Sequence, residues 1–274
     1  MVLNTYEPRK RFLVIGESGV GKTHTVNVLC GTQHNVSDSA IGTTFSFQSG
    51  NRRVHTFVDT IGLSEGDAGK IHPAVAFAKL VAFVKGNEEG FNGIFLIVDR
   101  PKVTKSMQEN YRLFVEQVTR KKVPCFLFVN KQELEDGYKD QYERNKHLYV
   151  RSGFDFEYGF AGGCKTNDMK VYTLGQFDSC ISMAPDESEK IYENTNFWYF
   201  VTDLWNQICK LFATVFGTDF EEPEDNSIAG IFKQMGVPDH LAREVARKTE
   251  TTGLTDDIID ELAQKLRNLK KSHS

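Results

Sequence analysis

Eight consecutive residues carry the clearest chemical signal in this chain of 274 residues. Gly16 to Thr23 read Gly-Glu-Ser-Gly-Val-Gly-Lys-Thr, which fits the pattern G-x-x-x-x-G-K-S/T of a phosphate-binding loop. Glycines let such a loop wrap closely, so that its N–H groups point at an anion. The amine of Lys22 adds a cation for the β- and γ-phosphates, and the hydroxyl of Thr23 is placed for Mg²⁺. The pattern therefore predicts that the chain binds a nucleoside phosphate.

The residues around this loop have the pattern that the motif requires. An apolar run, Phe12 to Ile15, precedes the loop and predicts a buried strand, and Val26 to Leu29 continue it with helical spacing. A chance match in a glycine-rich turn would lack this strand–loop–helix context. The residues that we expect to contact the phosphates are Gly16, Glu17, Ser18, Gly19, Val20, Gly21, Lys22, Thr23 and His24.

A second set of candidate ligands follows the next apolar strand. Asp59-Thr60-Ile61-Gly62 has the form D-x-x-G and comes directly after it. An acidic residue at this place can hold Mg²⁺, usually through water, and the N–H of Gly62 can meet a γ-phosphate and move away once it leaves. Upstream, Thr43 and Thr44 each offer a hydroxyl for the same task. We assign Thr44 to the metal site with Thr23 and Asp59, and to catalysis with Lys22, although the pattern does not separate it from Thr43.

The third motif, Asn130-Lys131-Gln132-Glu133, follows another apolar run. Guanine-binding sites typically have N-K-x-D here: the carboxylate accepts two hydrogen bonds from the base edge, and the lysine stem lies along the ring. Such contacts discriminate strongly, because a mismatched base leaves buried polar groups unpaired. Glu133 offers the same carboxylate on a side chain one methylene longer. Asn130, Lys131 and Glu133 therefore favour guanine without assuring it.

The three motifs need a scaffold whose strands end at one edge, and the apolar pattern predicts one. Continuous apolar runs at 94–98 and 125–129 are typical of central parallel strands. Residues 45–47 and 54–58 predict an antiparallel hairpin whose turn lies at 49–51. Strands and helices alternate, which predicts an α/β fold: a three-layer phosphate-loop NTPase domain with a mostly parallel central sheet. The ligand is expected at the carboxyl ends of the strands.

The end of the chain predicts a separate, smaller part. Residues 219–225 are acidic, contain a proline and predict a linker, and three short amphipathic helices follow. We therefore predict a nucleotide-binding domain over 1–218, the linker over 219–225 and a three-helix module over 226–274. A module of this size buries little apolar surface, so we expect it to pack on the main domain or to dock a protein partner.

Charge and composition argue against several other classes. Residues 219–274 hold twelve Asp or Glu against eight Lys or Arg, and the rest of the chain is balanced. Neither part has the basic stripe of a nucleic-acid binder. No apolar run reaches about 18 residues, so we expect no membrane span, and the N-terminus lacks the layout of a secretory signal. The five cysteines are scattered and never spaced as C-x-x-C, which indicates a reducing, cytoplasmic location.

In this order, the three motifs resemble those of the small-GTPase branch of the phosphate-loop NTPases. A narrower resemblance is to the immunity-associated GTPases (the GIMAP or IAN group), relatives of septins and of the chloroplast import GTPases. It rests on Asp59 to Leu63 and on residues 91–104, which are similar to that group's extra hydrophobic box. It covers roughly residues 10–215 and leaves the tail outside. The chain departs from the group at Ile61, where the group usually has proline, and at the base-reading motif.

This resemblance implies a switch protein that binds GTP or GDP with Mg²⁺ and dimerises across its nucleotide face. It implies that the loop at 16–23 carries phosphates and Mg²⁺, that Asp59 and Gly62 sense the γ-phosphate, and that the motif at 130–133 reads the base. The group also has a last loop that covers guanine, for which residues 161–163 (Ala-Gly-Gly) are the candidate here.

Catalysis is less clear than binding. Hydrolysis needs neutralised charge and a positioned water, and Lys22 with Mg²⁺ supplies only the first. Leu63 stands where many small GTPases hold a water-orienting glutamine, and its side chain cannot orient water. We therefore predict slow GTP hydrolysis, stimulated by dimerisation or by a partner that supplies the missing group. The candidates within the chain, for which a surface or packing role is the simpler interpretation, are His34, His55, His72, Arg52, Arg53 and Arg100.

Two other functions stay open from the residues alone. One is a scaffold that keeps its nucleotide permanently, which Leu63 and Glu133 favour. The other is an ATP-using phosphotransferase or ATPase, which would need a different base pocket and a second substrate site.

Overall fold

The computed structural model describes residues 8–33, 48–60, 72–87, 89–100, 102–132, 137–190, 208–210, 212–214, 227–252 and 254–272. The chain forms two compact units. The first combines Met1–Glu65 with Glu89–Ile191, and the second combines Gly66–Glu88 with Tyr192–Ser274. A segment from the first third of the sequence thus groups with the end of the chain. The domain boundaries at 218 and 226 stay predictions.

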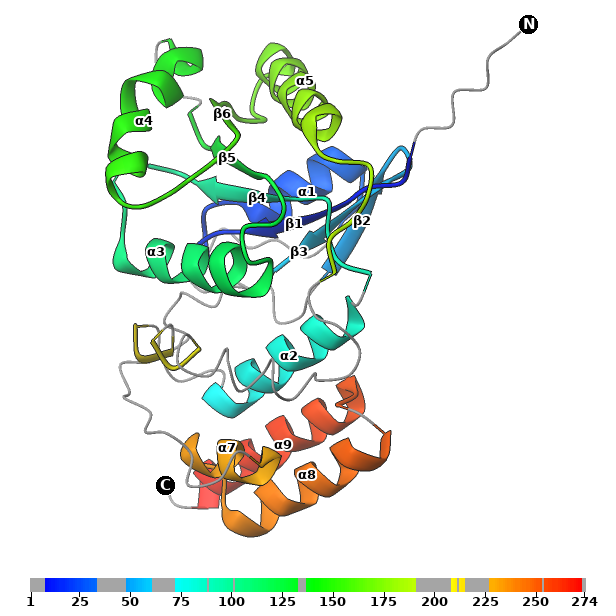
Figure 1. The fold of residues 1–274 in the computed structure, drawn as a ribbon. Coiled ribbons are helices and arrows are strands. Elements are labelled where there is room, and N and C mark those ends of the chain that lie inside the picture. Colours follow the sequence, from blue (N-terminus) through cyan, green and yellow to red (C-terminus); the bar gives the residue numbers. More distant parts are fainter. Residues whose placement is uncertain are drawn as a thin grey trace, which may run out of the picture. The chain divides into compact units, whose positions relative to one another are not determined.

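The first unit is built on a six-stranded sheet in the order β2-β3-β1-β4-β5-β6 (Figure 1). All neighbouring strands are parallel except β2 and β3, which form an antiparallel hairpin. The mostly parallel sheet of the predicted α/β fold is therefore confirmed. The strands are β1 (Arg11–Ile15), β2 (Gln48–Arg52), β3 (His55–Asp59), β4 (Gly93–Val98), β5 (Cys125–Val129) and β6 (Tyr158–Ala161).

Helices cover both faces of this sheet, with α5 on one side and α3 on the other (Figure 1). Residues 154–180, whose sequence pattern indicates no clear element, form β6 and most of α5. The apolar spacing of residues 107–118 predicts one amphipathic helix, and the backbone there changes from α-helical to π-helical geometry at Arg112. The helical elements of this unit are α1 (Lys22–Cys30), α3 (Lys105–Tyr111), η1 (Arg112–Val118), η2 (Tyr138–Asp140), α4 (Gln141–Arg151) and α5 (Asn167–Met183).

The core of the first unit is rich in phenylalanine. Alternate residues of the parallel strands point to one face of the sheet, where the rings pack on each other and on α1 and α5. Phe95 lies at the centre: its ring centroid is 5.4 Å from that of Phe12 and 4.7 Å from that of Phe177 on α5. This packing holds β1, β4 and α5 together, and so places the loops that leave the strands.

The predicted hairpin forms, but its turn is not where the glycine suggested. Residues 49–51 belong to β2, and the turn falls at Arg53 and Val54, where Arg53 takes a left-handed φ of 53°. Gly50 lies within β2, and the strand has a glycine at this position because α1 packs closely on it. A Cβ on Gly50 would lie 2.8 Å from the Cβ of Cys30. The glycine therefore marks a close approach of two elements and not a turn.

The second unit holds α2 (Pro73–Gly86), α7 (Ile228–Gln234), α8 (Asp239–Thr252) and α9 (Asp256–Ser272). Pro73 lies in the first turn of α2, where a helix tolerates proline. The imidazole Nδ1 of His72 accepts a hydrogen bond from the Ala74 N–H at 3.2 Å. Within this unit α2 packs against α9, and the rings of Phe77 and Phe232 meet edge to face with centroids 5.9 Å apart. The three predicted C-terminal helices are confirmed.

Apolar residues recur with helical spacing over 197–215, which predicts a long helix. The residues of this range that the structure describes, 208–210 and 212–214, are helical. The predicted linker at 219–225 lies outside them. Among the helices that the structure describes, none has the length and apolar character needed to cross a membrane.

Candidate nucleotide-binding site

The three motifs meet at one edge of the sheet because the strands that carry them are parallel. β1 runs into the loop at 16–21, β3 ends on Asp59 and β5 runs into Asn130. The carboxyl ends of parallel strands lie at the same edge, so this geometry follows from the sheet order. The structure therefore brings together sequence motifs that are separated by more than a hundred residues.

The loop after β1 depends on its glycines. Gly16, Gly19 and Gly21 have φ values of 147°, 74° and 93°, which side chains disfavour. A Cβ on Gly16 would lie 2.3 Å from the carbonyl oxygen of Ile97, and one on Gly21 would lie 2.6 Å from Nδ2 of Asn130. The N-cap of α1 is Gly21, which has no side chain to cap the first N–H groups of the helix. This is the arrangement in which a loop and a helix N-terminus bind phosphate.

Lys22 turns its amine back over this loop. Its Nζ donates a hydrogen bond to the Glu17 carbonyl oxygen at 2.8 Å, and the side chain is almost fully buried. A lysine amine has three N–H donors, so it can keep a carbonyl partner and still meet a phosphate oxygen. The predicted phosphate-binding cation therefore lies on the loop that it serves.

Thr23 and Asp59 form the proposed metal side of the site. The Thr23 hydroxyl donates a hydrogen bond to Oδ2 of Asp59 at 2.6 Å, and both side chains are buried. α1 supplies the hydroxyl and β3 supplies the carboxylate. Two neighbouring oxygen ligands, one of them charged, suit a small hard cation such as Mg²⁺.

The base-reading motif is attached directly to the phosphate loop. Nδ2 of Asn130 donates to the carbonyl oxygen of Val20 at 2.9 Å, and Nζ of Lys131 donates to that of Gly19. Lys131 has a left-handed φ of 59°, and its amine also lies 3.5 Å from a carboxylate oxygen of Asp99 at the end of β4. The two motifs thus form one continuous surface.

The glycines after β6 lie beside this surface. The Gln132 N–H donates to the Gly162 carbonyl oxygen at 3.2 Å. The Thr173 hydroxyl of α5 donates to the Gly163 carbonyl oxygen at 2.9 Å. A Cβ on Gly162 would lie 2.4 Å from the Thr173 hydroxyl oxygen, so the close approach requires glycine. The candidate for the loop that covers the base therefore lies next to the motif that reads it.

Several predicted site residues lie outside the described residues. These are Thr43 and Thr44, Gly62 of the D-x-x-G motif, and Glu133 of the base-reading motif. Leu63 and His34 also lie outside. Their roles stay predictions.

The other candidates for a catalytic role have structural partners. His55 is buried, and its Nδ1 accepts a hydrogen bond from a backbone N–H at 3.3 Å, while His72 caps α2. Arg52 forms a 2.8 Å ion pair with a carboxylate of α5, and Arg53 lies in the hairpin turn. Arg100 lies 3.0 Å from the carboxylate of the preceding residue. These contacts support a packing role for His55, His72 and Arg52 and a surface role for Arg53 and Arg100, whose side chains are exposed.

Sequence reasoning missed two residues of this edge, Asp99 and Thr104. Asp99 contacts Lys131, and the Thr104 hydroxyl donates to the Glu17 carboxylate. Asp99 comes directly after β4, and a polar residue at the end of a central parallel strand is the signal that could have identified it. Thr104 is the N-cap of α3, and no local signal connects it to the loop.

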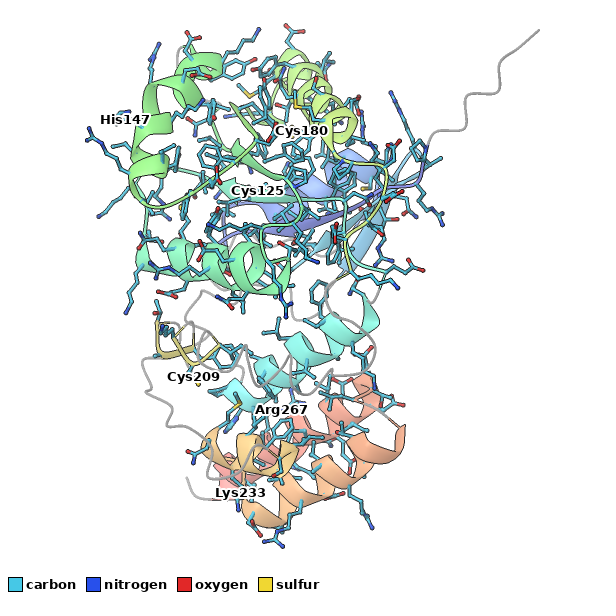
Figure 2. All side chains as sticks on the ribbon, viewed as in Figure 1. Cys125, His147, Cys180, Cys209, Lys233 and Arg267 are labelled. Carbon is cyan, nitrogen blue, oxygen red and sulfur yellow. The ribbon has the colours of Figure 1, made fainter. Side chains whose placement is uncertain are left out.

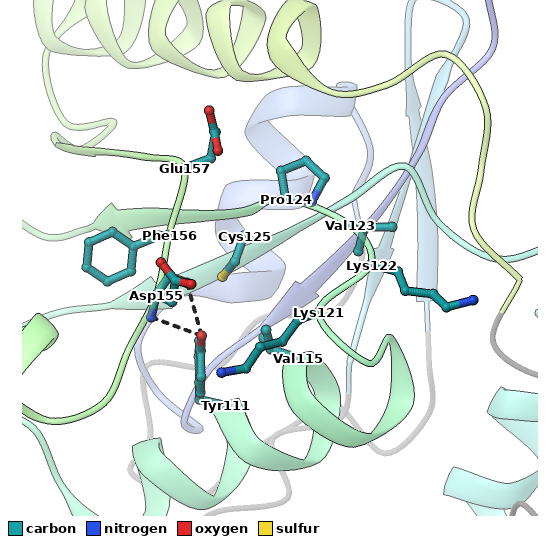
Figure 3. A pocket seen from close by; sticks show the side chains of 10 residues that line it. All are labelled: Tyr111, Val115, Lys121, Lys122, Val123, Pro124, Cys125, Asp155, Phe156 and Glu157. Atoms are coloured by element: carbon teal, nitrogen blue, oxygen red, sulfur yellow. Dashed lines mark hydrogen bonds between the residues drawn. The ribbon is translucent and has the colours of Figure 1, made fainter.

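A pocket of about 300 Å³ lies at the opposite end of β5, where this strand begins (Figure 3). The Tyr111 hydroxyl donates to the carbonyl oxygen of Asp155 at 3.0 Å and accepts from its N–H at 2.9 Å. Burial raises the pKa of Tyr111 to about 12. The two lysines at the rim have carboxylate partners: Lys121 lies 2.9 Å from one and Lys122 3.6 Å from another. This pocket is distinct from the edge that carries the motifs.

The phosphate loop follows β1, Asp59 ends β3 and the Asn-Lys pair follows β5. All three therefore lie at one edge of a sheet that has a single antiparallel strand. The first unit therefore has the fold of the nucleotide-binding G domain of phosphate-loop GTPases. The model of the family described as 50S ribosome-binding GTPase matches residues 11–131, less than half of the chain. That match covers all three motifs up to Lys131. No curated protein sequence matches the chain significantly.

Solved structures with this fold are similar at low identity. Era from Aquifex aeolicus bound to GDP·AlF4− is 16% identical with a TM-score of 0.50, over 69% of this chain and 61% of that one. Era in complex with MgGDPNP and nucleotides 1506–1542 of 16S ribosomal RNA is 16% identical, TM-score 0.48, over 72% and 66%. A dimerisation-deficient mutant of Toc33 from Arabidopsis thaliana is 18% identical, TM-score 0.47, over 68% and 88%.

The chain spans less than two thirds of the length of the two Era chains. At 16% identity, the likeness to the first Era structure establishes the fold alone. The narrower resemblance to the immunity-associated GTPases stays a prediction.

Proposed function

We propose that this protein is a guanine-nucleotide switch that binds GTP or GDP with Mg²⁺ and hydrolyses GTP slowly. The observation that carries the proposal is the attachment of the base-reading motif to the phosphate loop, through Asn130 and the Val20 carbonyl oxygen at 2.9 Å. One nucleotide can then lie along a single preformed surface, with its phosphates on the loop and its base at the residues after β5.

On this proposal, the loop at 16–21 wraps the phosphates with its N–H groups, and Lys22 neutralises their charge. Thr23 and Asp59 would hold Mg²⁺, and their buried oxygens, joined by the 2.6 Å hydrogen bond, fit that ion. When bound, Mg²⁺ supplies positive charge to the β- and γ-phosphate oxygens. Thr44 or Thr43 adds a further hydroxyl ligand, and the N–H of Gly62 senses the γ-phosphate.

The base specificity follows from the residues after β5. Asn130 ties the motif to the loop, the Lys131 stem lies along the purine, and Glu133 accepts the hydrogen bonds of the guanine edge. Replacing Glu133 with Ala should abolish the preference for guanine over adenine nucleotides, because guanine then loses its paired acceptor. A Glu133→Asp variant serves as the control and should keep it.

The slow rate follows from Leu63, which cannot orient water. We propose that a second copy of the G domain, or a protein partner bound through the C-terminal helices, supplies the missing group in the cytoplasm. The rate of GTP hydrolysis per protomer, measured across a dilution series with the oligomeric state followed in parallel, tests this point. Substantial turnover by dilute, demonstrably monomeric protein would contradict it.

The first test of the proposal is displacement of a fluorescent guanine nucleotide from the Mg²⁺-loaded protein by GTP, GDP, ATP and ADP. We expect only the guanine nucleotides to compete. Equal competition by adenine nucleotides would point to a phosphate-loop ATPase or an unselective NTPase. A nucleotide that never leaves, with no turnover, would support a non-catalytic scaffold instead.

A further inference from the structure

We propose that Thr104 is a positioning residue for the phosphate loop and acts through the side chain of Glu17. This inference rests on the proposed nucleotide binding, since a positioned loop matters only if the loop holds phosphate. Thr104 lies outside the three motifs. It begins α3, whereas Glu17 is the second residue of the loop after β1.

Thr104 makes two different hydrogen bonds with one hydroxyl. As the N-cap of α3, with an extended backbone (φ −95°, ψ 161°), it accepts from the Met107 N–H at 3.0 Å. The Thr104 hydroxyl donates its own proton to Oε1 of Glu17. A hydroxyl can donate once while it accepts, so neither bond excludes the other. The helix start and the phosphate loop therefore share this residue.

Glu17 connects this contact to the phosphate-binding amine. Its own carbonyl oxygen accepts the 2.8 Å hydrogen bond from Nζ of Lys22. On its other side lies Gly16, whose Cα has no room for a side chain against the Ile97 carbonyl oxygen. The backbone of Glu17 is thus held between a tightly packed glycine and the lysine, and Thr104 holds its side chain. Loss of the Thr104 contact should free the residue whose carbonyl positions Lys22.

The anchor itself is firmly packed. In the first turns of α3, the side chains of Met107 and Tyr111 are buried, with exposures of 0% and 1%. A loop held to such an element is already ordered before its ligand arrives, so binding has less conformational entropy to remove. We therefore expect Thr104 to act on affinity. GTP and GDP should be affected alike, because the loop contacts phosphates that both nucleotides carry.

A matched control exists at the start of α5. Thr166 caps that helix with nearly the same backbone (φ −106°, ψ 156°), and its hydroxyl oxygen accepts from the Met169 N–H at 3.3 Å. The two threonines therefore share the capping role, and Thr104 in addition donates a hydrogen bond to Glu17. Aspartate caps helices about as well as threonine but cannot donate a proton when ionised. Thr104→Asp thus keeps the cap and places a carboxylate against that of Glu17.

The experiment measures dissociation constants for fluorescent GDP and for a non-hydrolysable GTP analogue on the full chain. For Thr104→Asp, we expect both constants to rise by about tenfold, the scale expected when a charge-assisted hydrogen bond is lost. The dissociation constants of Thr104→Ser and Thr166→Asp should stay within about twofold of the wild-type values, because substitutions at unrelated surface positions have small effects. The melting temperatures of the two aspartate variants should agree, which separates positioning from capping.

The route through Glu17 is tested in the Glu17→Ala background. There, Thr104→Asp should have no further effect on either constant, because its partner is already gone. Additive losses would overturn the route, and a Thr104→Asp variant that binds as tightly as Thr166→Asp would overturn the inference while the proposed function stands. Should Thr104→Asp fail to fold, Thr104→Ala and Thr166→Ala give the same comparison. If the wild type binds no guanine nucleotide, the proposed function fails first, and this inference fails with it.

Discussion

The Thr23 hydroxyl donates a 2.6 Å hydrogen bond to Oδ2 of Asp59 across 36 residues of sequence. The start of α1 and the end of β3 are thereby joined at the proposed Mg²⁺ site. Both side chains are buried, and Asp59 is fully so. A carboxylate in such a place needs compensation for its lost hydration, which a cation would supply together with the hydroxyl.

Replacing Asp59 with Asn should make nucleotide binding less dependent on Mg²⁺. The amide oxygen can still accept from Thr23, but the charge that favours the cation is gone. We expect the wild type to bind GDP at least about tenfold more tightly with Mg²⁺ than with a chelator, and Asp59→Asn to lose most of that difference. Titrations of fluorescent GDP in both conditions measure this. Asp168→Asn, at an exposed position of α5, should behave as the wild type.

Replacing Asn130 with Ala should separate the base side of the site from the phosphate loop. The change removes the 2.9 Å hydrogen bond to the Val20 carbonyl oxygen and leaves a buried acceptor unpaired. We expect a loss of about 1–3 kcal/mol in the free energy of unfolding, and weaker binding of GTP and GDP. Denaturant titration and nucleotide titration measure the two effects. Unchanged nucleotide affinity in a destabilised variant would show that the contact serves the fold alone.

Two glycine substitutions should have opposite effects. A Cβ on Gly50 would lie 2.8 Å from the Cβ of Cys30, whereas one on Gly175, inside α5, meets no atom within 4 Å. Gly50→Ala should destabilise the protein by about 1–3 kcal/mol through overpacking. Gly175→Ala should leave it unchanged or stabilise it by up to about 1 kcal/mol, because alanine favours the helix. Thermal unfolding of both variants checks the sign of each change.

The C-terminal helices should lose stability in acid within a defined range. Lys248 and Lys265 lie between the carboxylates of Glu244 and Glu261, and these contacts join α8 to α9. The hydrogen bonds from Lys248 and Lys265 lower the pKa of Glu261 from 4.5 to about 2. The contribution of the Glu261 carboxylate to the stability of α8 and α9 is therefore complete above pH 4.5 and is lost as the pH falls toward 2. Hydrogen exchange of α8 and α9 should show this loss.

The same network supplies the control for that experiment. Glu261→Gln should flatten the acid dependence, because the substituted side chain does not titrate. Added salt should weaken the effect in the wild type, since these side chains are partly exposed to solvent. An unaltered pH profile in the variant would assign the acid sensitivity to other groups.

Three cysteines should resist thiol reagents in the folded protein. Burial raises the pKa of Cys30, Cys125 and Cys180 to about 12, so little thiolate exists at neutral pH. Figure 2 labels Cys125 on β5 and Cys180 on α5. A chromogenic thiol reagent at pH 8 should react slowly with these three cysteines in the folded protein and fully after unfolding. Rapid reaction of Cys125 in the native protein would contradict its burial at the start of β5.

The sequence determined the motifs and most of the elements, because both are written in local patterns. Continuous apolar runs identified β4 and β5, and the spacing of glycines, lysine and threonine identified the phosphate loop with its flanking strand and helix. These signals need only neighbouring residues. The turn of the hairpin was placed wrongly for the same reason. Gly50 resembles a turn residue in its local sequence, but the structure requires a glycine there because the side chain of Cys30 on α1 packs against it.

Contacts between distant residues were decided only by the tertiary structure. The hydrogen bonds from Thr23 to Asp59, from Asn130 to Val20 and from Thr104 to Glu17 span 36, 110 and 87 residues. No local pattern specifies such pairs, because they depend on the order of strands in the sheet. The grouping of α2 with the C-terminal helices is of the same kind. The sequence thus determined which residue types could bind a nucleotide, and packing of the sheet determined which of these residues lie together.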